Sequence, residues 1–317
     1  MLNFPDQKAL RVLRSAAEKE LAWLRTYGRP RFPFERAYRE TSLYKKQEPK
    51  EHYKSLEEHL KLSPYFIPTH SKLNRSVLRH PDLQHNNIFI SEDFSITGLI
   101  DWQRSTILPT FLVAGIPKSF QSYDDEESLS FVLPKLPDHI DTVDEGCRAR
   151  ELEQFRRCHV HFFYLGFTRQ LNGPHWHAIK GRGLLRRRIF DHAGSPWEGL
   201  NTPLQMEIVQ VTHNWPNIAS PMPDGTVPAC PVVVTELEAQ KPRELADSLR
   251  EVDSEMEHIH DVLGIASDGW TPNEAFDTAK KGIEMIKEEG LKEVADDPWL
   301  KKMSQQHWPF DDFDEDE

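Results

Sequence analysis

Apolar residues recur along much of the chain at the spacing of an α-helix. Over Leu10–Leu24 they step by three and four residues, which predicts an amphipathic helix over residues 6–27. Over Leu245–Leu263 the same steps give one apolar stripe along an otherwise charged helix, which we expect to pack within its own domain. Further helices are predicted over residues 49–62, 147–171 and 184–192. The pattern therefore predicts a mainly α protein.

One stretch, residues 88–100, has the pattern of two short strands. Ile88–Ile90 is an apolar run, residues 91–94 are a polar turn, and Ile96–Ile100 returns as a second run. Two runs separated by a short polar turn are typical of a β-hairpin. The hairpin adds a small β component, so the predicted fold class is mainly α with an α+β element.

Prolines and a further helix start divide the rest of the chain. Residues 216–232 contain five prolines and one glycine, which predicts a loop and the most marked internal break. Thr271-Pro272-Asn273-Glu274 predicts a capping box, with the Thr271 hydroxyl accepting from the Glu274 amide and Pro272 at the first helical position. We expect five segments: an N-terminal helical segment and connector (1–48), a catalytic core (49–215), the proline-rich loop (216–232), C-terminal helices (233–305) and a solvated acidic tail (306–317).

Charge and cysteine content exclude several function classes. The 39 basic and 51 acidic side chains give the 317-residue chain a net charge of −12, which argues against nucleic-acid partners. The three cysteines show no CxxC spacing, so we expect neither a disulfide framework nor a zinc site. No apolar run approaches the roughly 20 residues of a membrane span. The N-terminal residues show no targeting segment, and the oligomeric state is open.

The candidate chemistry lies around the predicted hairpin. In His80-Pro81-Asp82-Leu83-Gln84-His85-Asn86-Asn87 a carboxylate and an amide stand five residues apart, and Asp101 ends the second strand. Phosphoryl transfer needs a base beside the attacking group and oxygen ligands that hold Mg²⁺ against the phosphates. We therefore predict Asp82 as the catalytic base, supported by His80 bracing the loop, and Asn87 and Asp101 as Mg²⁺ ligands.

These motifs resemble those of known phosphotransferases. The first resembles the His-x-Asp-x-x-x-x-Asn loop of protein kinase-like enzymes. Gly98-Leu99-Ile100-Asp101-Trp102 resembles the Ile-Asp-Trp metal motif of the aminoglycoside phosphotransferase family. Three further stretches are similar to a fungal branch related to the altered inheritance of mitochondria phosphotransferases. Together with Gly98–Trp102, which shares this similarity, they are Arg79-His80-Pro81-Asp82-Leu83, Gly269-Trp270-Thr271-Pro272-Asn273-Glu274 and His307-Trp308-Pro309-Phe310-Asp311-Asp312.

The resemblance implies a kinase-type C-lobe that uses ATP and Mg²⁺ to phosphorylate a small molecule with a hydroxyl or amino group. It also implies an association with mitochondria, with the cytoplasm as the alternative. Pro81 stands where antibiotic-modifying relatives usually carry glycine, which argues against antibiotic modification. The 79 residues before His80 contain one glycine, Gly28, and no strand lysine, so we expect the nucleotide-binding N-lobe to be absent or truncated and nucleotide binding to be weak. The alternative function is a non-catalytic pseudokinase or interaction protein whose helical C-lobe forms a binding surface.

Other polar clusters have structural explanations. His159 and His161, and likewise His175 and His177, lie in aromatic-rich sequence, so packing is favoured over metal binding. Arg186-Arg187-Arg188 could meet phosphate, but in an acidic protein such clusters usually pair with acidic neighbours. Trp102 either shapes the metal loop or is an ordinary core tryptophan.

Overall fold

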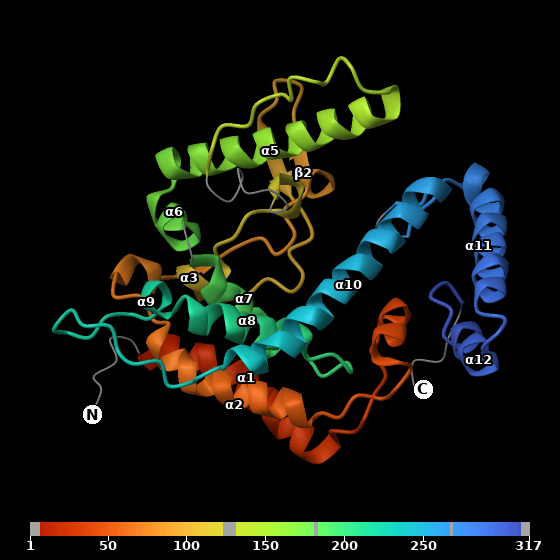
Figure 1. Ribbon diagram of the computed structural model, residues 1–317. Helices are drawn as coiled ribbons and strands as arrows, with labels where there is room; N and C mark the ends of the chain where they lie inside the picture. Colours follow the sequence, from red (N-terminus) through yellow and green to blue (C-terminus); the bar gives the residue numbers. More distant parts are fainter. Residues whose placement is uncertain (1–6, 123–130, 181–182, 267–268, 312–317) are drawn as a thin grey trace. The chain divides into compact units, whose positions relative to one another are not determined.

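The computed structural model describes residues 7–122, 131–180, 183–266 and 269–311 (Figure 1). Within these ranges the protein is mainly helical, with two small antiparallel sheets of two strands each. The helices are α1 (Gln7–Tyr27), α2 (Lys50–Leu62), α3 (Thr110–Val113), α5 (Glu145–Leu171), α6 (Gly173–Ile179), α7 (Gly183–Gly194), α8 (Thr202–His213), α9 (Trp215–Ile218), α10 (Glu236–Leu263), α11 (Asn273–Glu293) and α12 (Pro298–Gln306). The strands are β1 (Ser76–Leu78), β2 (Ile88–Ile90), β3 (Ile96–Leu99) and β4 (Ile107–Pro109).

The elements predicted from local periodicity are confirmed. Helices α1, α2, α5 and α7 cover the ranges that the apolar spacing indicates, and β2 and β3 form the predicted hairpin, pairing Ile88 with Leu99. In α1, Leu13, Ala17 and Leu24 are buried, so the stripe faces the interior. Periodicity succeeds here because one face of each helix is buried.

The chain divides into two compact units, each built from separated stretches. Unit 1 comprises Met1–Ser15, Leu62–Asp191 and Asn214–Ala229, and unit 2 comprises Ala16–Lys61, His192–His213 and Cys230–Glu317. Within the proline-rich loop the chain passes from unit 1 to unit 2 after Ala229.

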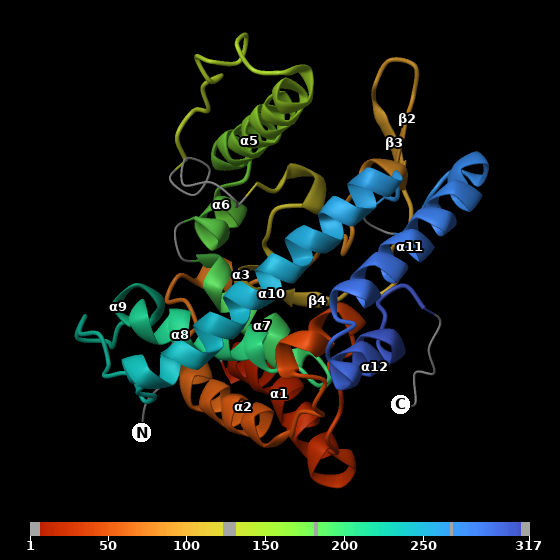
Figure 2. The same ribbon diagram turned by 45° about the vertical axis from the view of Figure 1, so that its right-hand side comes forward.

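Unit 1 holds both sheets. Strand β1 pairs with β4, with Val77 opposite Leu108, although these strands are far apart in the sequence. Helix α3 follows β4 directly and contacts α6, which in turn contacts the long helix α5. The β2–β3 hairpin extends away from this group, as the turned view in Figure 2 shows.

Unit 2 is arranged around the long helix α10. This helix contacts α8, α11 and the 3-10 helix Arg36–Ser42, and α11 runs alongside it in Figure 2. Of the predicted stripe, Leu249 is buried and the other members are half-buried. The stripe therefore serves packing within unit 2.

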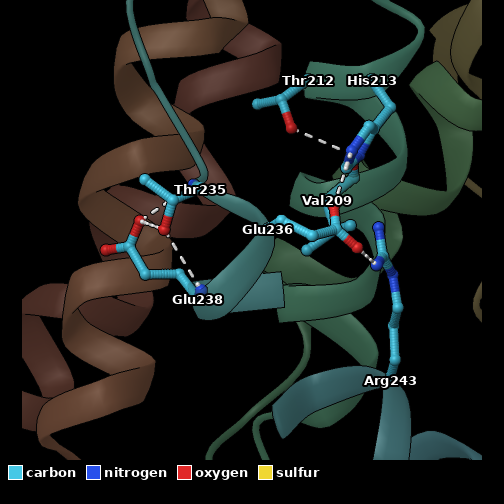
Figure 3. Close-up of polar contacts among 7 residues, drawn as sticks. All are labelled: Val209, Thr212, His213, Thr235, Glu236, Glu238 and Arg243. Atoms are coloured by element: carbon cyan, nitrogen blue, oxygen red, sulfur yellow. Dashed lines mark hydrogen bonds and ion pairs between the residues drawn. The ribbon is translucent and has the colours of Figure 1, made fainter. Parts of the chain in front are cut away.

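Helix α10 begins with a capping box that the sequence reasoning missed (Figure 3). The Thr235 hydroxyl accepts from the Glu238 amide at 3.2 Å, and the Glu238 carboxylate accepts from the Thr235 amide at 3.0 Å. Beside it, Glu236 pairs with Arg243 and lies 3.9 Å from the His213 ring of α8. These contacts satisfy amides of the first turn and join α10 to α8.

The capping box predicted at Thr271 is wrong. Helix α11 begins after Pro272, which occupies the cap position itself and makes no side-chain cap bond. Thr271 therefore stands one residue too early, and its hydroxyl donates to the Gly264 carbonyl at 3.4 Å. The motif matched in spacing, but the helix starts one residue later than the motif requires.

In unit 2, Trp197 is 2% exposed and donates two hydrogen bonds to polar groups. Its backbone amide donates to the Glu20 carboxylate at 2.8 Å, and its indole donates to the Arg29 carbonyl at 3.2 Å. Burial raises the pKa of Glu20. The amide therefore compensates part of the cost of burying this carboxyl group.

None of the helices in the described ranges combines the length and apolar character that a bilayer crossing requires. The prediction of no membrane-spanning segment agrees with this finding.

Candidate functional site

His80 links the predicted catalytic loop to the end of the hairpin. Its side chain is 6% exposed, and its ring Nε2 lies 2.6 Å from the Ile100 carbonyl. Its Nδ1 accepts from the Asp82 backbone amide at 3.3 Å. The two contacts together assign the ring proton to Nε2. His80 thus makes the bracing contacts that the sequence reasoning expected of it.

Trp102 packs against this histidine. The two rings meet edge to face with centroids 4.7 Å apart, and the indole donates to the Leu99 carbonyl at 3.1 Å. Trp102 is 41% exposed, so it differs from an ordinary core tryptophan. Of the two alternatives from the sequence, these contacts favour the one in which Trp102 shapes the loop after β3.

Asn87 connects the predicted catalytic loop at Asp82 with Ile100, the residue that follows β3. Its side-chain amide donates to the Asp82 carbonyl at 2.9 Å, and its own carbonyl accepts from the Ile100 amide at 3.1 Å. The side chain is 6% exposed. Because the nitrogen makes the bond to Asp82, the amide oxygen is the atom that could ligate a cation.

Asp101 follows directly in a left-handed conformation, with φ of 61°. This conformation costs most residues on the order of 1–2 kcal/mol, and aspartate tolerates it better than most. The residue is exposed and stands next to Ile100, which is bonded to both His80 and Asn87. The structure therefore brings Asp82, Asn87 and Asp101 to one end of the hairpin.

The Asp82 carboxylate accepts from the Gln84 side chain at 2.9 Å and lines a cavity of about 290 Å³. Of the four predicted residues, His80 and Asp82 belong to the lining of this cavity, whereas Asn87 and Asp101 do not. The cavity also receives four charged groups that the sequence reasoning did not connect with it. They are Arg79, Lys118, Arg187 and Asp191.

Arg79 follows β1, Lys118 begins the 3-10 turn Lys118–Phe120, and Arg187 and Asp191 both lie on α7. Arg187 on α7 donates to Asp191 at 3.2 Å, which agrees with the expectation that the arginine cluster pairs with acidic neighbours. Burial raises the pKa of Asp191, and Arg187 opposes this shift. Arg186 turns elsewhere and donates to the Ile218 carbonyl at 2.5 Å, and burial lowers its pKa to about 10.

Gly115 contacts the two arginines that line the cavity. Its carbonyl accepts from the Arg79 guanidinium and lies 3.1 Å from the His175 Nε2. A Cβ atom at Gly115 would collide with the Arg187 guanidinium. His175 therefore lies in a cationic setting: burial first, then the charges of Arg79 and Arg187, lower its pKa to about 4.

The other singled-out histidines have packing contacts. His161 is buried and accepts from the Ser122 amide at 3.0 Å. His159 lies against the Phe155 ring with centroids 4.2 Å apart, and His177 stacks with His70 at 6.2 Å. All of these are contacts of the structural kind that the sequence reasoning favoured.

The predicted Mg²⁺ ligands at the hairpin end are one carboxylate, from Asp101, and one amide, from Asn87. In the parts of the chain that the structure describes, no three His, Cys, Asp or Glu side chains gather closely enough to hold a metal ion. Mg²⁺ in phosphotransferases usually takes one or two protein oxygens and completes its shell with water and phosphate. The assignment of Asp101 and Asn87 as Mg²⁺ ligands therefore stays a prediction.

Comparisons with known proteins find distant fungal relatives. Over 312 residues the chain is 27% identical to a subtelomeric hrmA-associated cluster protein of Aspergillus fumigatus, which covers 96% of this chain and 58% of that protein. Over 240 residues it is 24% identical to the altered inheritance of mitochondria protein 9, mitochondrial, of Kluyveromyces lactis, covering 70% of this chain and 34% of that protein. A shorter match of 63 residues, 20% of this chain and 15% of the relative, is 40% identical to the clavilactone A biosynthesis cluster protein Y of Ampulloclitocybe clavipes.

The chain spans 58% of the length of the Aspergillus relative. No family model matches the sequence. No solved structure matches it either. The resemblance to a mitochondrial inheritance protein is therefore supported at the level of weak similarity, and the kinase-like family stays a prediction.

Proposed function

We propose that this chain carries the catalytic and metal-binding segment of a kinase-like phosphotransferase related to the aminoglycoside phosphotransferases. The observation that carries the proposal is the set of hydrogen bonds from His80 and Asn87. They gather a carboxylate facing a cavity, an amide and a second carboxylate at one end of a hairpin. The reaction would move the γ-phosphoryl group of ATP to a hydroxyl or amino group of a small molecule.

Each residue has a distinct role in this proposal. Asp82, held by Gln84, orients the acceptor in the cavity and takes its proton. Asn87 and Asp101 supply oxygens that hold Mg²⁺ against the nucleotide phosphates, where the ion supplies charge neutralisation. His80 positions Asp82 and the segment that leads to Asp101, because its ring bonds to the Asp82 amide and to the Ile100 carbonyl.

The nucleotide is expected to bind weakly. Ahead of β1 the described residues form α1, α2 and short 3-10 segments, and Gly28 is the one glycine before His80. Kinase-like enzymes grip the triphosphate with a glycine-rich loop and a strand lysine. With the hairpin end alone, affinity rests on Mg²⁺ and its two ligands.

A thermal-shift titration with Mg-ATP tests the proposal, because a ligand that binds the folded state raises its stability. We expect a saturable, Mg²⁺-dependent rise in Tm for the wild type and loss of that rise in Asp101→Asn. Glu92→Gln is the matched control, since Glu92 is an exposed carboxylate on the turn of the same hairpin. A wild type that shows no Mg²⁺-dependent rise, or a rise that Asp101→Asn retains in full, would refute the phosphotransferase proposal.

A non-catalytic binding role is the second candidate, and exposed apolar side chains favour it. Phe94 and Ile96 on the hairpin are 83% and 69% exposed, and Phe167 on α5 is 59% exposed. Such residues often mark interaction surfaces. If Asp82→Ala keeps the cellular role while Phe94→Ser with Ile96→Ser abolishes it, the binding role is favoured over the enzyme.

We also propose a mitochondrial location, on the sole support of the Kluyveromyces relative whose name includes that compartment. Expression of the protein from its complete coding sequence, with a C-terminal fluorescent tag, tests this. Cytoplasmic fluorescence would overturn it.

A further inference from the structure

The cavity beside Asp82 differs in charge from the rest of the chain. The whole chain carries a net charge of −12, whereas Arg79, Lys118 and Arg187 face this cavity against two carboxylates, Asp82 and Asp191. One of the acids is the proposed base. The remaining wall therefore has a surplus of cationic groups.

The cationic groups are held in place by packing. Lys118 begins the 3-10 turn Lys118–Phe120, which contacts α5, and Phe120 stacks on Tyr164 with centroids 5.4 Å apart. Arg187 lies against Gly115, where no side chain intervenes. These contacts place the backbone of Lys118 and the Arg187 guanidinium beside the cavity, while the Lys118 side chain is exposed.

Two of the three cationic side chains, Lys118 and Arg187, are placed to bind a ligand. The Arg79 guanidinium is engaged by the Gly115 carbonyl and by His175. Arg187 is paired with Asp191, whose side chain is 50% exposed. An anionic group could therefore compete for Arg187, while Lys118 supplies an exposed ammonium at the same wall.

We propose that the acceptor carries an anionic group, a carboxylate or a phosphate, which Lys118 and Arg187 bind while Asp82 orients the attacking hydroxyl. This inference rests on the proposed function and names its substrate class. In the transfer, the hydroxyl oxygen bonds to the γ-phosphorus, the bond to the departing ADP oxygen breaks, and Asp82 takes the proton. Cationic acceptors are disfavoured because the same wall repels them.

The cavity volume limits the acceptor to a small molecule. Ligand pockets for drug-sized molecules typically span roughly 300–1,000 Å³. At about 290 Å³ this cavity lies at the lower end of that range. A phosphorylated or carboxylated polyol of three to six carbons is the class we infer, with one hydroxyl facing Asp82.

Isothermal titration with matched ligands tests the inference. Glycerol 3-phosphate and glycerate are compared with glycerol, which carries a neutral CH₂OH group where they carry a phosphate ester or a carboxylate. We expect each anionic compound to bind the wild type at least about tenfold more tightly than glycerol, since a hydrogen bond to a charged group contributes roughly 1.5–3 kcal/mol. Equal affinity for the charged and neutral members would overturn the inference.

Variants locate the site. Lys118→Met should weaken glycerol 3-phosphate binding about tenfold, and Lys135→Met is the control because Lys135 is an exposed lysine of unit 1 that does not line the cavity. Arg187→Met should act likewise, with circular dichroism to verify its fold. Unchanged binding in a folded Lys118→Met protein, or a loss of the same size in Lys135→Met, would contradict the assignment. Inorganic phosphate that binds as tightly as glycerol 3-phosphate would also contradict it, because the polyol would then contribute nothing.

The two proposals can fail separately. The Mg-ATP titration of Asp101→Asn reports on the metal end of the hairpin, and the ligand pairs report on the cavity wall. A protein that binds Mg-ATP but does not distinguish glycerol from glycerol 3-phosphate keeps the phosphotransferase proposal and loses the anionic acceptor. A protein that prefers glycerol 3-phosphate but shows no Mg²⁺-dependent effect keeps an anion-binding cavity and loses the phosphotransferase proposal.

Discussion

The centre of unit 2 and the hairpin of unit 1 use apolar side chains in opposite ways. Trp197 is 2% exposed and its polar atoms bond to Glu20 and Arg29. In the hairpin, Phe94 is 83% exposed and Ile96 is 69% exposed. The candidate site therefore lies at the end of a hairpin whose apolar side chains are exposed. Polar contacts such as those of His80 hold the site residues in position.

Because of this difference, we expect the centre of unit 2 to contribute mainly to stability and the hairpin end to contribute mainly to ligand binding. A buried aromatic side chain contributes through its lost contact with water, whereas an exposed strand contributes mainly through its backbone pairing. Substitutions at the centre of unit 2 should change the free energy of unfolding most. Substitutions at the hairpin end should change ligand binding with smaller effects on unfolding.

Trp197→Ala should have the largest effect, a loss of about 3–5 kcal/mol, because it removes a buried aromatic ring and leaves a cavity. Urea unfolding followed by circular dichroism measures it. Trp102→Ala is the comparison, since that tryptophan is 41% exposed. Similar losses in the two variants would break the contrast between the regions.

Acidification should destabilise unit 1 through His175. Its folded pKa is about 4 against an ordinary value of 6.5, so between these values the unfolded state binds more protons. This contribution is fully present above pH 6.5 and is lost as the pH falls toward 4, by up to about 3 kcal/mol. Urea unfolding over this range should show a shallower pH slope in His175→Gln than in the wild type. Parallel curves would rule out this histidine as the cause.

Gly115→Ala should displace the Arg187 guanidinium at a cost of about 1 kcal/mol, because the group that must move is the end of a flexible side chain. It should also weaken glycerol 3-phosphate binding. Gly166→Ala, in the middle of α5 with no atom within 4 Å of the added carbon, is the control and should stabilise by roughly 0.5–1 kcal/mol. A Gly115→Ala protein as stable as the wild type would show that the Arg187 guanidinium moves aside at no cost in stability.

Thr235→Ala should have the smallest effect, a loss of about 1 kcal/mol, because it removes the capping box of α10. Thr271→Ala should change stability by only a few tenths of a kcal/mol, since Thr271 caps no helix. Thermal unfolding of the two variants in parallel measures the difference. A larger effect at Thr271 would contradict the helix start seen at Pro272.

Local sequence pattern predicted the elements whose signal is local. The α1 stripe and the apolar run Ile88–Ile90 each lie within one element. Helix α8 was missed because Ile208, Val209 and Val211 are all buried, so no single apolar stripe stands out. The β1–β4 pair was missed because its three-residue strands meet only through a long-range contact.

In the candidate site, likewise, the sequence grouped only residues that lie close together along the chain. Asp82, Asn87 and Asp101 lie within 20 residues of one another, and the hairpin alone brings them together. Lys118 and Arg187 reach the cavity from a turn after α3 and from α7. Their meeting depends on how α5 and its neighbours pack, which no spacing along the chain encodes.

The left-handed backbone at Asp101 also narrows what a saturation-mutagenesis library can recover at that position. Glycine, asparagine and aspartate adopt this conformation at low cost, whereas valine, isoleucine and threonine do so poorly. Selection for folding alone should therefore enrich those three residues. Additional selection for phosphoryl transfer should retain aspartate, so comparing the two enrichment profiles separates the backbone requirement from the carboxylate requirement.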